Sequence, residues 1–453
     1  MKTVSSSRRD FLKAAGGALS ATTLLARSAS RILGANERVH VGMIGFGIRG
    51  SQLVRNVYAE PNTEVVAVAD LYDGHLARAL ELAEDHPKPA TTKRYQEILE
   101  RQDVGAVVVA VPDFWHKRVC LDALAAGKHV YCEKPLLHNI EDAADFIAAV
   151  ERSGKIFQVG SQHVSSPHVI EARRLIQSGE LGKVTQIKTT WDTNTVISAW
   201  EMPVPSDASV GTIDWTTYLE QASHKVPFDP ARFFSWRQFQ DYGEALAGDV
   251  LVHMITTVHF VMSVTAAPPV ISAAGGRFVW DDGRDVYDAI SILSHYPEGF
   301  IANYEANQDN QFLGQHIYIL GSKASMDLTF GDYKVYAEDW PISWSYAVES
   351  WARPEREKFY RAHNLPLTPS RKYSPPGAPK PIKESAPLDY QQYVSGFSPH
   401  MASFMAAIRE GKQPVEDVHM GVEAATTAIL GNRALAAQRT LHWDRRTRTL
   451  AEA

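Results

Sequence analysis

The sequence predicts an α/β protein in which a doubly wound parallel sheet precedes a second α/β domain with an open, mostly antiparallel sheet. Three observations predict it: a strand–glycine turn–helix unit near residue 45, apolar strands that alternate with helical patterns up to residue 159, and later strands of alternating polarity. The 453 residues allow two or three domains at about 150 residues each. Apolar (45%) and charged (22%) fractions are those of a globular protein, which argues against long disordered or fibrous regions.

The first unit begins with a β-rich run over 38–44 that leads into a glycine turn, Gly45-Phe46-Gly47-Ile48-Arg49-Gly50. A helical pattern follows, and a second apolar strand, 65–69, ends at Asp70. Glycines let the backbone turn tightly and approach a pyrophosphate at a helix N-terminus, and a carboxylate about twenty residues on can accept hydrogen bonds from a ribose diol. The alternative is a glycine turn that packs two elements and binds nothing. The pattern favours a Rossmann dinucleotide site.

Strands predicted over 106–111, 130–132 and 156–159 and helices over 116–126 and 140–151 continue this domain. Two polar clusters follow the strands, Pro112-Asp113-Phe114-Trp115-His116 and Glu133-Lys134-Pro135. Ligands of doubly wound sheets bind at the carboxyl ends of strands. The residues expected to bind the cofactor are Gly45, Gly47, Ile48, Arg49, Gly50, Asp70, Pro112, Asp113, His116 and Glu133. Asp70 would repel a 2′-phosphate, which favours NAD, whereas Arg49 could soften that preference toward NADP.

The second half contains strands predicted over 184–191, 270–279, 288–294, 300–306 and 315–320, and closing helices over 400–409 and 421–438. We place the nucleotide domain at 36–158 and the second domain at 159–445. A proline-rich stretch, 364–388, is predicted to be an extended surface loop.

The pattern over 243–262 predicts a helix that places Asp249 and His253, four residues apart, on one face. Removal of a hydroxyl proton during hydride transfer needs a base with a pKa near 7, and histidine is the natural choice. Asp249 could orient the imidazole. The pair could instead bind a metal, but no third ligand is evident, so no metal site is expected. His259 lies further round the helix and is expected to be a packed or exposed histidine.

Several aromatic residues precede this helix, among them Trp191, Trp200, Trp215, Trp236 and Tyr242. Aromatic faces with nearby arginines suit a sugar ring, although most of these side chains could simply pack a core. The substrate contacts proposed on this basis are Trp115, Arg232, Trp236, Arg237 and Tyr242.

The N-terminus predicts an export signal over residues 1–35. Ser7-Arg8-Arg9-Asp10-Phe11-Leu12-Lys13 precedes a weakly apolar stretch, 14–26, that is shorter than the roughly 20 residues needed to span a membrane. Adjacent arginines in this context are typical of twin-arginine export, for which the translocation machinery is the expected partner. This route delivers a folded protein to the periplasm or the medium, and no stable membrane anchor is expected. The alternative is an accidental basic tail.

The formal charge of −6 gives no support to nucleic-acid binding. Two cysteines, Cys120 and Cys132, cannot form a disulfide scaffold for a chain of this length.

The chain resembles the Gfo/Idh/MocA family of nicotinamide-dependent oxidoreductases, in particular an exported sugar-acting branch that includes glucose–fructose oxidoreductase and is related to inositol dehydrogenase. The motifs that carry the resemblance are the glycine turn, Pro112–His116, Ala126–Pro135, Asp214-Trp215, Pro227–Phe233, Trp236-Arg237, Asp249 with His253, and Leu430–Asn432. The resemblance implies that Lys134 contacts a substrate hydroxyl, that Asp249 and His253 complete the catalytic set, and that the Lys134–Pro135 bond is cis. It also implies that the second domain binds substrate and forms a dimer or tetramer.

The chain departs from the family at a glycine run, which here is Gly243-Glu244-Ala245-Leu246-Ala247-Gly248, at Thr256 and at Phe114. The identity of the sugar therefore stays open.

We expect an NAD(P)-dependent oxidoreductase that moves a hydride between a carbohydrate or polyol carbon and a tightly bound nicotinamide. Little dinucleotide is free outside the cell, which favours a redox-neutral cycle. An NAD-dependent redox glycosidase is the first alternative, and a non-catalytic sugar-binding protein is the second.

Overall fold

The structure is a computed structural model that describes residues 38–195, 197–338, 348–364, 380–387 and 398–451. The expected export signal, 1–35, and most of the proline-rich stretch lie outside these residues. The chain forms two compact units. Unit 1 extends to Gln162 and includes Trp200–Ala245 and Ser395–Ala425, and unit 2 comprises His163–Ala199, Leu246–Val394 and Thr426–Ala453. The units therefore do not follow the contiguous division at residues 158 and 159 that the sequence suggested.

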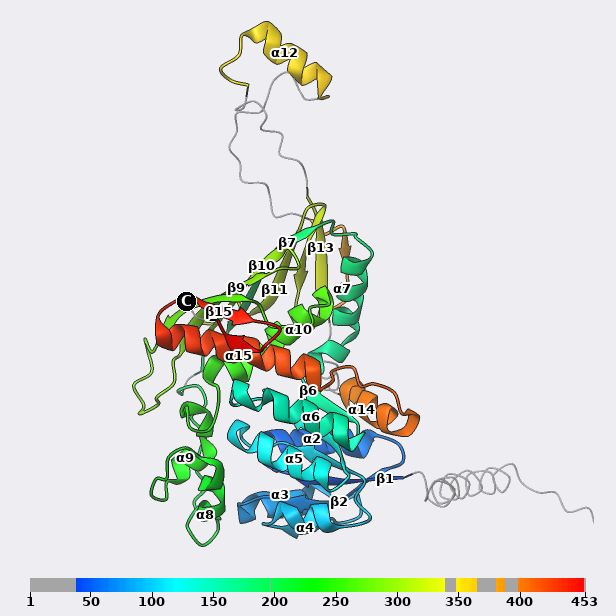
Figure 1. Cartoon of the computed structure of the whole chain (residues 1–453), viewed down its shortest axis with the longest axis vertical. Coiled ribbons are helices and arrows are strands. Elements are labelled where there is room, and N and C mark those ends of the chain that lie inside the picture. The colour runs from blue at the N-terminus through cyan, green and yellow to red at the C-terminus, as the bar shows by residue number, and fades with distance from the viewer. Residues whose placement is uncertain (1–37, 196, 339–347, 365–379, 388–397, 452–453) are drawn as a thin grey trace, which may run out of the picture. The chain divides into compact units, whose positions relative to one another are not determined.

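Unit 1 is built on a six-stranded parallel sheet (Figure 1). Its strands are β1 (Val39–Ile44), β2 (Thr63–Ala69), β3 (Ala90–Thr92), β4 (Ala106–Val109), β5 (His129–Glu133) and β6 (Phe157–Gly160). The order β3-β2-β1-β4-β5-β6 confirms the doubly wound sheet. The order reverses between β1 and β4, where such sheets bind ligands beyond the carboxyl ends of their strands.

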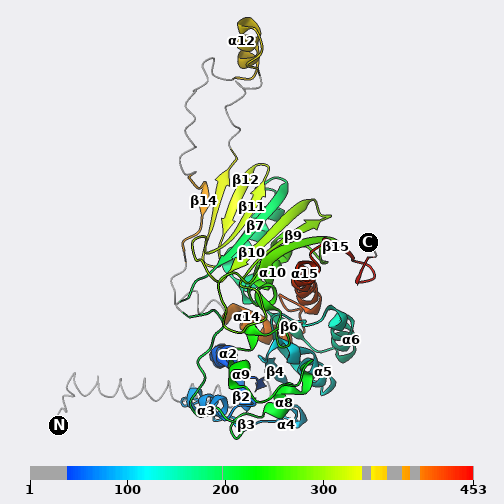
Figure 2. The same ribbon diagram turned by 90° about the vertical axis from the view of Figure 1, so that its left-hand side faces the viewer.

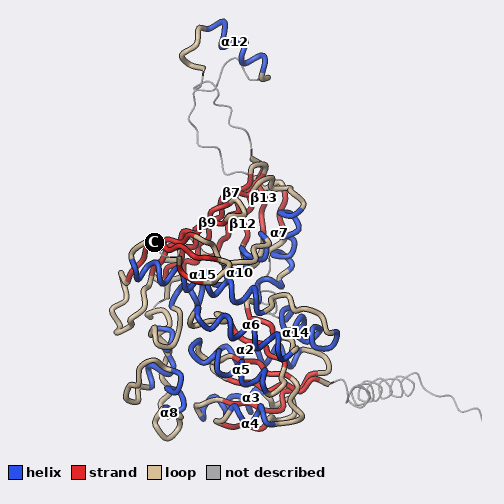
Figure 3. The backbone as a smooth tube through the Cα atoms, viewed as in Figure 1, coloured by secondary structure: helices blue, strands red, loops and turns tan. Residues whose placement is uncertain are grey.

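Helices alternate with these strands, as the tube in Figure 3 shows. They are α2 (Ile48–Ala59), α3 (Asp73–Leu82), α4 (Tyr95–Glu100), α5 (His116–Ala125), α6 (Ala143–Ser153) and the late α14 (Ser398–Glu410). Met401, Phe404 and Met405 of α14 join the core that Val41 and Leu53 form. This apolar face explains why a segment more than two hundred residues beyond β6 belongs to unit 1.

The segment 200–245 packs along unit 1 and carries two short helices, α8 (Trp215–Tyr218) and α9 (Pro230–Phe234). The carboxylates of Asp214 and Asp229 cap them by accepting backbone N–H groups of Thr217 and Ala231. An isolated bridge joins Tyr72 to Ile213, which attaches the segment to the chain that leaves β2.

Unit 2 contains a ten-stranded sheet (Figure 2). Its order is β14-β13-β12-β11-β7-β10-β9-β8-β15-β16, in which β7 and β10 pair in parallel and the other neighbouring strands pair antiparallel. The strands are β7 (Val184–Asp192), β8 (Val270–Gly276), β9 (Ala289–Tyr296), β10 (Phe300–Asn307), β11 (Gln315–Gly321), β12 (Ala324–Leu328), β13 (Tyr333–Ala337), β14 (Lys383–Glu384), β15 (Leu441–Asp444) and β16 (Thr449–Leu450). The mostly antiparallel sheet is confirmed. The described part of the proline-rich stretch differs from a plain loop, because β14 pairs with β13.

Residues on β9 and β10 alternate between a buried and an exposed face. Ile292 and Tyr304 are fully buried, whereas Leu293 and Ile301 are 49% and 36% exposed. The helices of unit 2 are α7 (Pro167–Gln177), α10 (Val252–Met262), α12 (Arg353–Ala362) and the part of α15 (Val418–Ala437) that begins at Thr426. Among the described residues, no helix is long and apolar enough to cross a membrane.

The helix predicted over 243–262 is shorter than expected. A π-helical turn covers Ala247–Leu251 and α10 follows it, while Gly243 and Glu244 are not helical. The backbone N–H of Glu244 donates to Asp113 Oδ2, so this residue is tied to another segment instead of the first helical turn.

Candidate functional site

The glycine turn of unit 1 has the geometry of a phosphate cradle. Gly45 has a φ of +85°, and a Cβ there would lie 2.5 Å from the carbonyl oxygen of Ala110. A Cβ on Gly50 would lie 2.2 Å from the carbonyl oxygen of Gly45, so both positions require glycine. A Cβ on Gly47 would have His75 Cε1, at 3.7 Å, as its nearest neighbour, so the backbone of Gly47 is open to a ligand. The N-terminus of α2 follows at Ile48, where N–H groups favour an anion.

Asp70 follows β2 at the carboxyl edge of the sheet. Its Oδ2 accepts the N–H of Phe46 at 2.6 Å, and its Oδ1 accepts the N–H of Tyr72 at 2.9 Å and lies 3.0 Å from His75 Nδ1. The carboxylate is therefore fixed beside the glycine turn, where the sequence placed the ribose contact. Burial raises the pKa of Asp70, but the charge and hydrogen bond of His75 and the two backbone donors outweigh it and lower the pKa.

Arg49 and Glu133, both predicted to contact the cofactor, pair with each other. Arg49 Nε donates to Glu133 Oε1 at 3.0 Å, and Gln162 Nε2 donates to the same oxygen at 2.7 Å. The pair joins the glycine turn to the strand end that precedes Lys134. Its charge neutralisation allows Glu133 to be buried.

His116 supports the turn that follows β5. Its Nδ1 lies 2.8 Å from the carbonyl oxygen of Pro135 and its Nε2 lies 3.0 Å from that of Val111. Burial lowers the pKa of His116 to about 4, against smaller opposing effects of the two carbonyls. Lys134 directly follows β5, and the Lys134–Pro135 bond is cis, as predicted.

The structure adds a pair that was not predicted from the sequence, His138 and Glu244. His138 Nδ1 lies 3.0 Å from Glu244 Oε1, and both side chains are largely buried. Burial lowers the pKa of His138, but the hydrogen bond and charge of Glu244, with the charges of Asp113 and Asp142, outweigh it and raise the pKa. Glutamate in place of the family's glycine at position 244 was a signal visible in the sequence. Nothing in the sequence indicated that His138 would be its partner.

In unit 2, His253 of α10 lies among aromatic rings. The ring of Trp191 stacks on it at a centroid distance of 5.6 Å, and His163 approaches edge-on at 5.1 Å. His163 stacks in turn on Phe330 at 3.5 Å. Asp249 lies in the π-helical turn before α10, a form often found at functional sites. From the sequence, Trp191 was only one of several aromatic candidates, and His163 was not predicted.

His259 is fully buried, and its Nε2 lies 2.9 Å from the Tyr296 hydroxyl. Burial lowers its pKa to about 3, together with a smaller effect of Arg445. The expectation of a packed histidine is confirmed.

The proposed substrate contacts divide into two kinds. Trp115 and Tyr242 are buried, and Trp115 Nε1 donates to the Tyr218 carbonyl at 2.9 Å. Packing therefore accounts for these two. Arg232 and Arg237 lie over the rings of Phe239 and Trp236 at 4.0 and 4.2 Å from the ring centroids, which orients both guanidinium groups.

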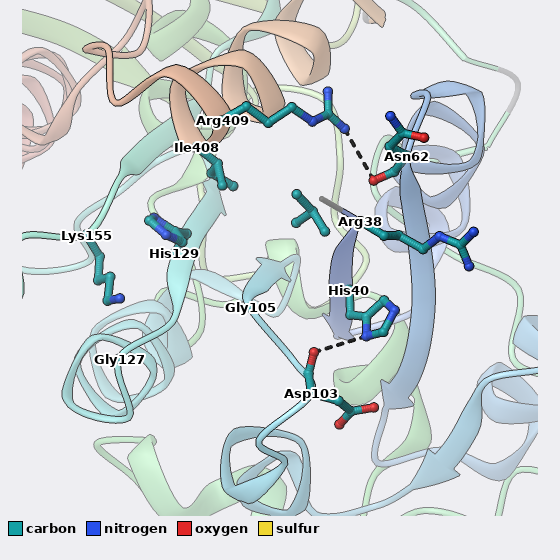
Figure 4. Close-up of a pocket in the computed structure, with 11 residues that line it drawn as sticks. Arg38, His40, Asn62, Asp103, Gly105, Gly127, His129, Lys155, Ile408 and Arg409 are labelled. Atoms are coloured by element: carbon teal, nitrogen blue, oxygen red, sulfur yellow. Dashed lines mark hydrogen bonds between the residues drawn. The ribbon is translucent and has the colours of Figure 1, made fainter. Parts of the chain in front are cut away.

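A cavity of about 600 Å³ lies at the opposite edge of the parallel sheet (Figure 4). Its lining includes His40, at the start of β1, together with His129, Lys155 and Arg409. Lys155 follows the C-terminus of α6, where a positive charge offsets the helix dipole. The cavity is separate from the glycine turn, so it is not the dinucleotide site.

Together, a 3-2-1-4-5-6 sheet, an open glycine turn and an acidic residue after β2 define a dinucleotide-binding protein of the Rossmann class. The sequence model of the Gfo/Idh/MocA oxidoreductase family, an NAD-binding Rossmann fold, matches residues 39–161, and that family's C-terminal domain model matches 216–327. The two matches cover just over half of the chain. The chain belongs to the Gfo/Idh/MocA family, and its N-terminal domain is the NAD-binding domain of that family.

Two curated relatives match part of the chain. The α-N-acetylgalactosaminidase of Shewanella oneidensis is 32% identical in an alignment of 172 positions, which covers 33% of this chain and 38% of that protein. Inositol 2-dehydrogenase of Corynebacterium glutamicum is 28% identical over 154 residues, 34% of this chain and 45% of that protein. The chain thus matches less than half the length of these curated relatives.

A solved structure of levoglucosan dehydrogenase in complex with NADH and levoglucosan shares the fold. Its TM-score is 0.63 at 17% identity, over 89% of this chain and 99% of that one.

Proposed function

We propose that the protein is an NAD(P)-dependent oxidoreductase that moves a hydride between a hydroxyl-bearing carbon of a sugar, polyol or glycoside and a tightly bound nicotinamide. The observation that carries the proposal is the glycine turn, which is open above Gly47 and has the Asp70 carboxylate fixed beside it. Names of relatives that act on N-acetylgalactosaminides, inositol and levoglucosan support a carbohydrate or polyol as substrate.

The residues of unit 1 fit the cofactor. Gly47 leaves room for the pyrophosphate, Asp70 would hold the ribose hydroxyls, and the pair of Arg49 with Glu133 would fix the turn. When bound, the nicotinamide supplies the acceptor or donor of the hydride. The protein's own residues then bind the hydroxyl and move its proton.

We assign those tasks to three residues. Lys134 would hold the substrate hydroxyl as a hydrogen-bond donor. His253 would accept its proton, with the ring held by stacking on Trp191. Asp249 would favour the charged imidazole through its negative charge. The assignment of Lys134, Asp249 and His253 is supported by the motif resemblance of the chain to its family.

A redox glycosidase is a second candidate, favoured by the 32% identity to an α-N-acetylgalactosaminidase. Cleavage of a glycosidic bond beside a transient ketone needs acid–base groups in addition to the hydroxyl base. His138 and Glu244 would supply such a pair.

Export and assembly belong to the same proposal. The arginines at positions 8 and 9 support twin-arginine export of the cofactor-loaded protein to the periplasm or medium. The exposed face of the large sheet, with Leu293 and Ile301, would suit a homo-oligomer.

The decisive test has two steps. Mass spectrometry of nucleotide released from purified protein should detect NAD or NADP in near-stoichiometric amount. Addition of sugars, polyols and glycosides should then change the absorbance of the reduced nicotinamide. Free sugar released from a glycoside without net cofactor consumption would favour the glycosidase, and silence toward every substrate with bound cofactor would favour a sugar-binding protein.

A further inference from the structure

His75 lies at the ribose end of the proposed dinucleotide site. It belongs to the first turn of α3, five residues after Asp70, and its Nδ1 is 3.0 Å from Asp70 Oδ1. A Cβ on Gly47 would lie 3.7 Å from His75 Cε1. The imidazole therefore lies between the carboxylate that would bind the ribose and the open backbone of the glycine turn.

Aromatic rings hold His75 in this place. Tyr72 contacts it edge-on at a centroid distance of 5.0 Å. Phe233 and Phe234 of α9 lie at 6.4 and 6.0 Å. Three rings from two segments leave the imidazole little freedom to turn away from Asp70, so the charge of His75 acts at a fixed position.

The electrostatic surroundings favour a charged His75 at moderately acidic pH. Burial lowers the pKa of His75, but the charge and hydrogen bond of Asp70 outweigh it and raise the pKa above the ordinary value. Two other carboxylates lie nearby: Asp73 pairs with Lys93 at 2.9 Å, and Asp207 accepts a hydrogen bond from the Tyr72 hydroxyl. His75 is therefore the group near Asp70 whose charge changes around neutral pH.

We propose that His75 sets the choice between NAD and NADP and makes that choice depend on pH. With a neutral imidazole, Asp70 faces the 2′ position of the adenosine ribose as an uncompensated anion and repels a phosphate there. With an imidazolium, the pair is neutral overall and offers the phosphate a charged donor. The inference rests on the proposed dinucleotide function and adds a residue that governs its specificity.

Exchange of bound nucleotide tests the proposal on the intact protein and does not require turnover. The purified protein is incubated with an equimolar excess of NAD and NADP at several values between about pH 6 and pH 9, desalted, and its retained nucleotides are quantified by mass spectrometry. For the natural protein we expect the NADP-to-NAD ratio to fall by about tenfold as pH rises, which corresponds to about 1.4 kcal/mol.

Three variants distinguish the charge of His75 from other causes of a pH-dependent nucleotide ratio. His75→Gln stays neutral, so its ratio should be low at every pH, and any remaining slope reports titration of the 2′-phosphate itself. His75→Lys stays charged across this range and should keep a high ratio at every pH. His86→Gln, at an exposed histidine of the same unit, is the matched control and should behave as the natural protein.

The outcomes are distinguishable. Retention of NAD with the same ratio and slope in the natural protein, His75→Gln and His75→Lys overturns the role of His75 and leaves the proposed function standing. Retention of neither nucleotide by the natural protein overturns the proposed function and this inference with it. Circular dichroism of each variant establishes that it is folded before its ratio is compared.

Discussion

The carboxylate of Glu244 lies 3.0 Å from the Nδ1 atom of His138, although 106 positions separate the two residues in the chain. The backbone N–H of the same glutamate donates to Asp113 Oδ2 at 3.2 Å. Asp113 follows β4 and His138 lies beyond β5, so Glu244 joins the carboxyl ends of two neighbouring strands. A glycine at position 244 would keep the backbone contact and lose the ion pair.

Loss of this pair should destabilise the protein in a pH-dependent way. The folded-state pKa of His138 is raised, so its stabilisation is complete below the unfolded-state pKa and is lost as pH rises through the folded-state pKa. We expect His138→Asn to lower the free energy of unfolding by about 2 kcal/mol near pH 6 and by less at pH 9. Urea unfolding at both values measures this. His224→Asn, which removes an exposed ion pair with Asp241 at 2.8 Å, should cost less than about 0.5 kcal/mol. Equal losses at both pH values would contradict the ion-pair account.

Substitutions at two glycines of the turn should have different consequences. Gly50→Ala places a Cβ 2.2 Å from a backbone oxygen and should lower the thermal midpoint, whereas Gly47→Ala meets its nearest atom at 3.7 Å and should leave the fold intact. Gly47→Ala should nonetheless weaken dinucleotide binding about 100-fold, or about 2.7 kcal/mol, because the methyl group occupies the cradle. Calorimetry and nucleotide retention measure the two effects. Gly211→Ala, with its nearest atom at 3.7 Å and no part in the turn, is the control. Unchanged retention in Gly47→Ala would place the pyrophosphate elsewhere.

Replacement of the proposed base should remove turnover and spare the cofactor. We expect His253→Asn to lower kcat by about 10²–10⁴-fold, because the hydroxyl proton then has no acceptor of suitable pKa. Nucleotide retention should not change, since the glycine turn belongs to unit 1. Single-turnover absorbance of the nicotinamide with an active substrate measures the rate. His363→Asn, at an exposed position just after α12, should keep the natural rate. A normal rate in His253→Asn would transfer the base role to another residue.

Glu416 should make unit 1 less stable as pH rises. This residue is fully buried, and burial raises its pKa to about 8 despite a hydrogen bond from the Ser161 N–H to Oε2 at 3.1 Å. Because the folded-state pKa is raised, stability is lost between the unfolded-state pKa and about pH 8, by up to about 1.4 kcal/mol per pH unit. Glu416→Gln, which cannot ionise, should therefore gain stability relative to the natural protein between about pH 5 and pH 8. Thermal midpoints of the natural protein and of Glu416→Gln, measured across this pH range, test the prediction. If the two midpoints change in parallel with pH, Glu416 does not titrate in this range.

Much of the fold followed from local pattern. Five of the six strands of unit 1 were predicted, because buried parallel strands are short apolar runs such as the fully buried Ala106–Val109. Strand β3 and helices α3 and α4 were not predicted. Strands β12 and β13 were not predicted, although the buried Met326 and Val335 alternate with partly exposed neighbours. Each of these strands has only five residues, so the alternation of apolar and polar residues is too short to predict a strand. The helical run predicted from residue 243 begins at Ala245, because Glu244 is held by its hydrogen bond to Asp113, which is not visible in a helical pattern.

By itself, the sequence determined the glycine turn, the position of Asp70, the strand end that carries Lys134, and the family. Each of these features depends on the spacing of residues within one short segment, and that spacing is visible in the sequence. The tertiary structure alone decided that 200–245 and 395–425 belong with the parallel sheet, that Arg49 pairs with Glu133, and that His75 lies against Asp70. Ion pairs and ring contacts between distant segments depend on side-chain distances of a few ångströms, and those distances are set by how the whole domain packs.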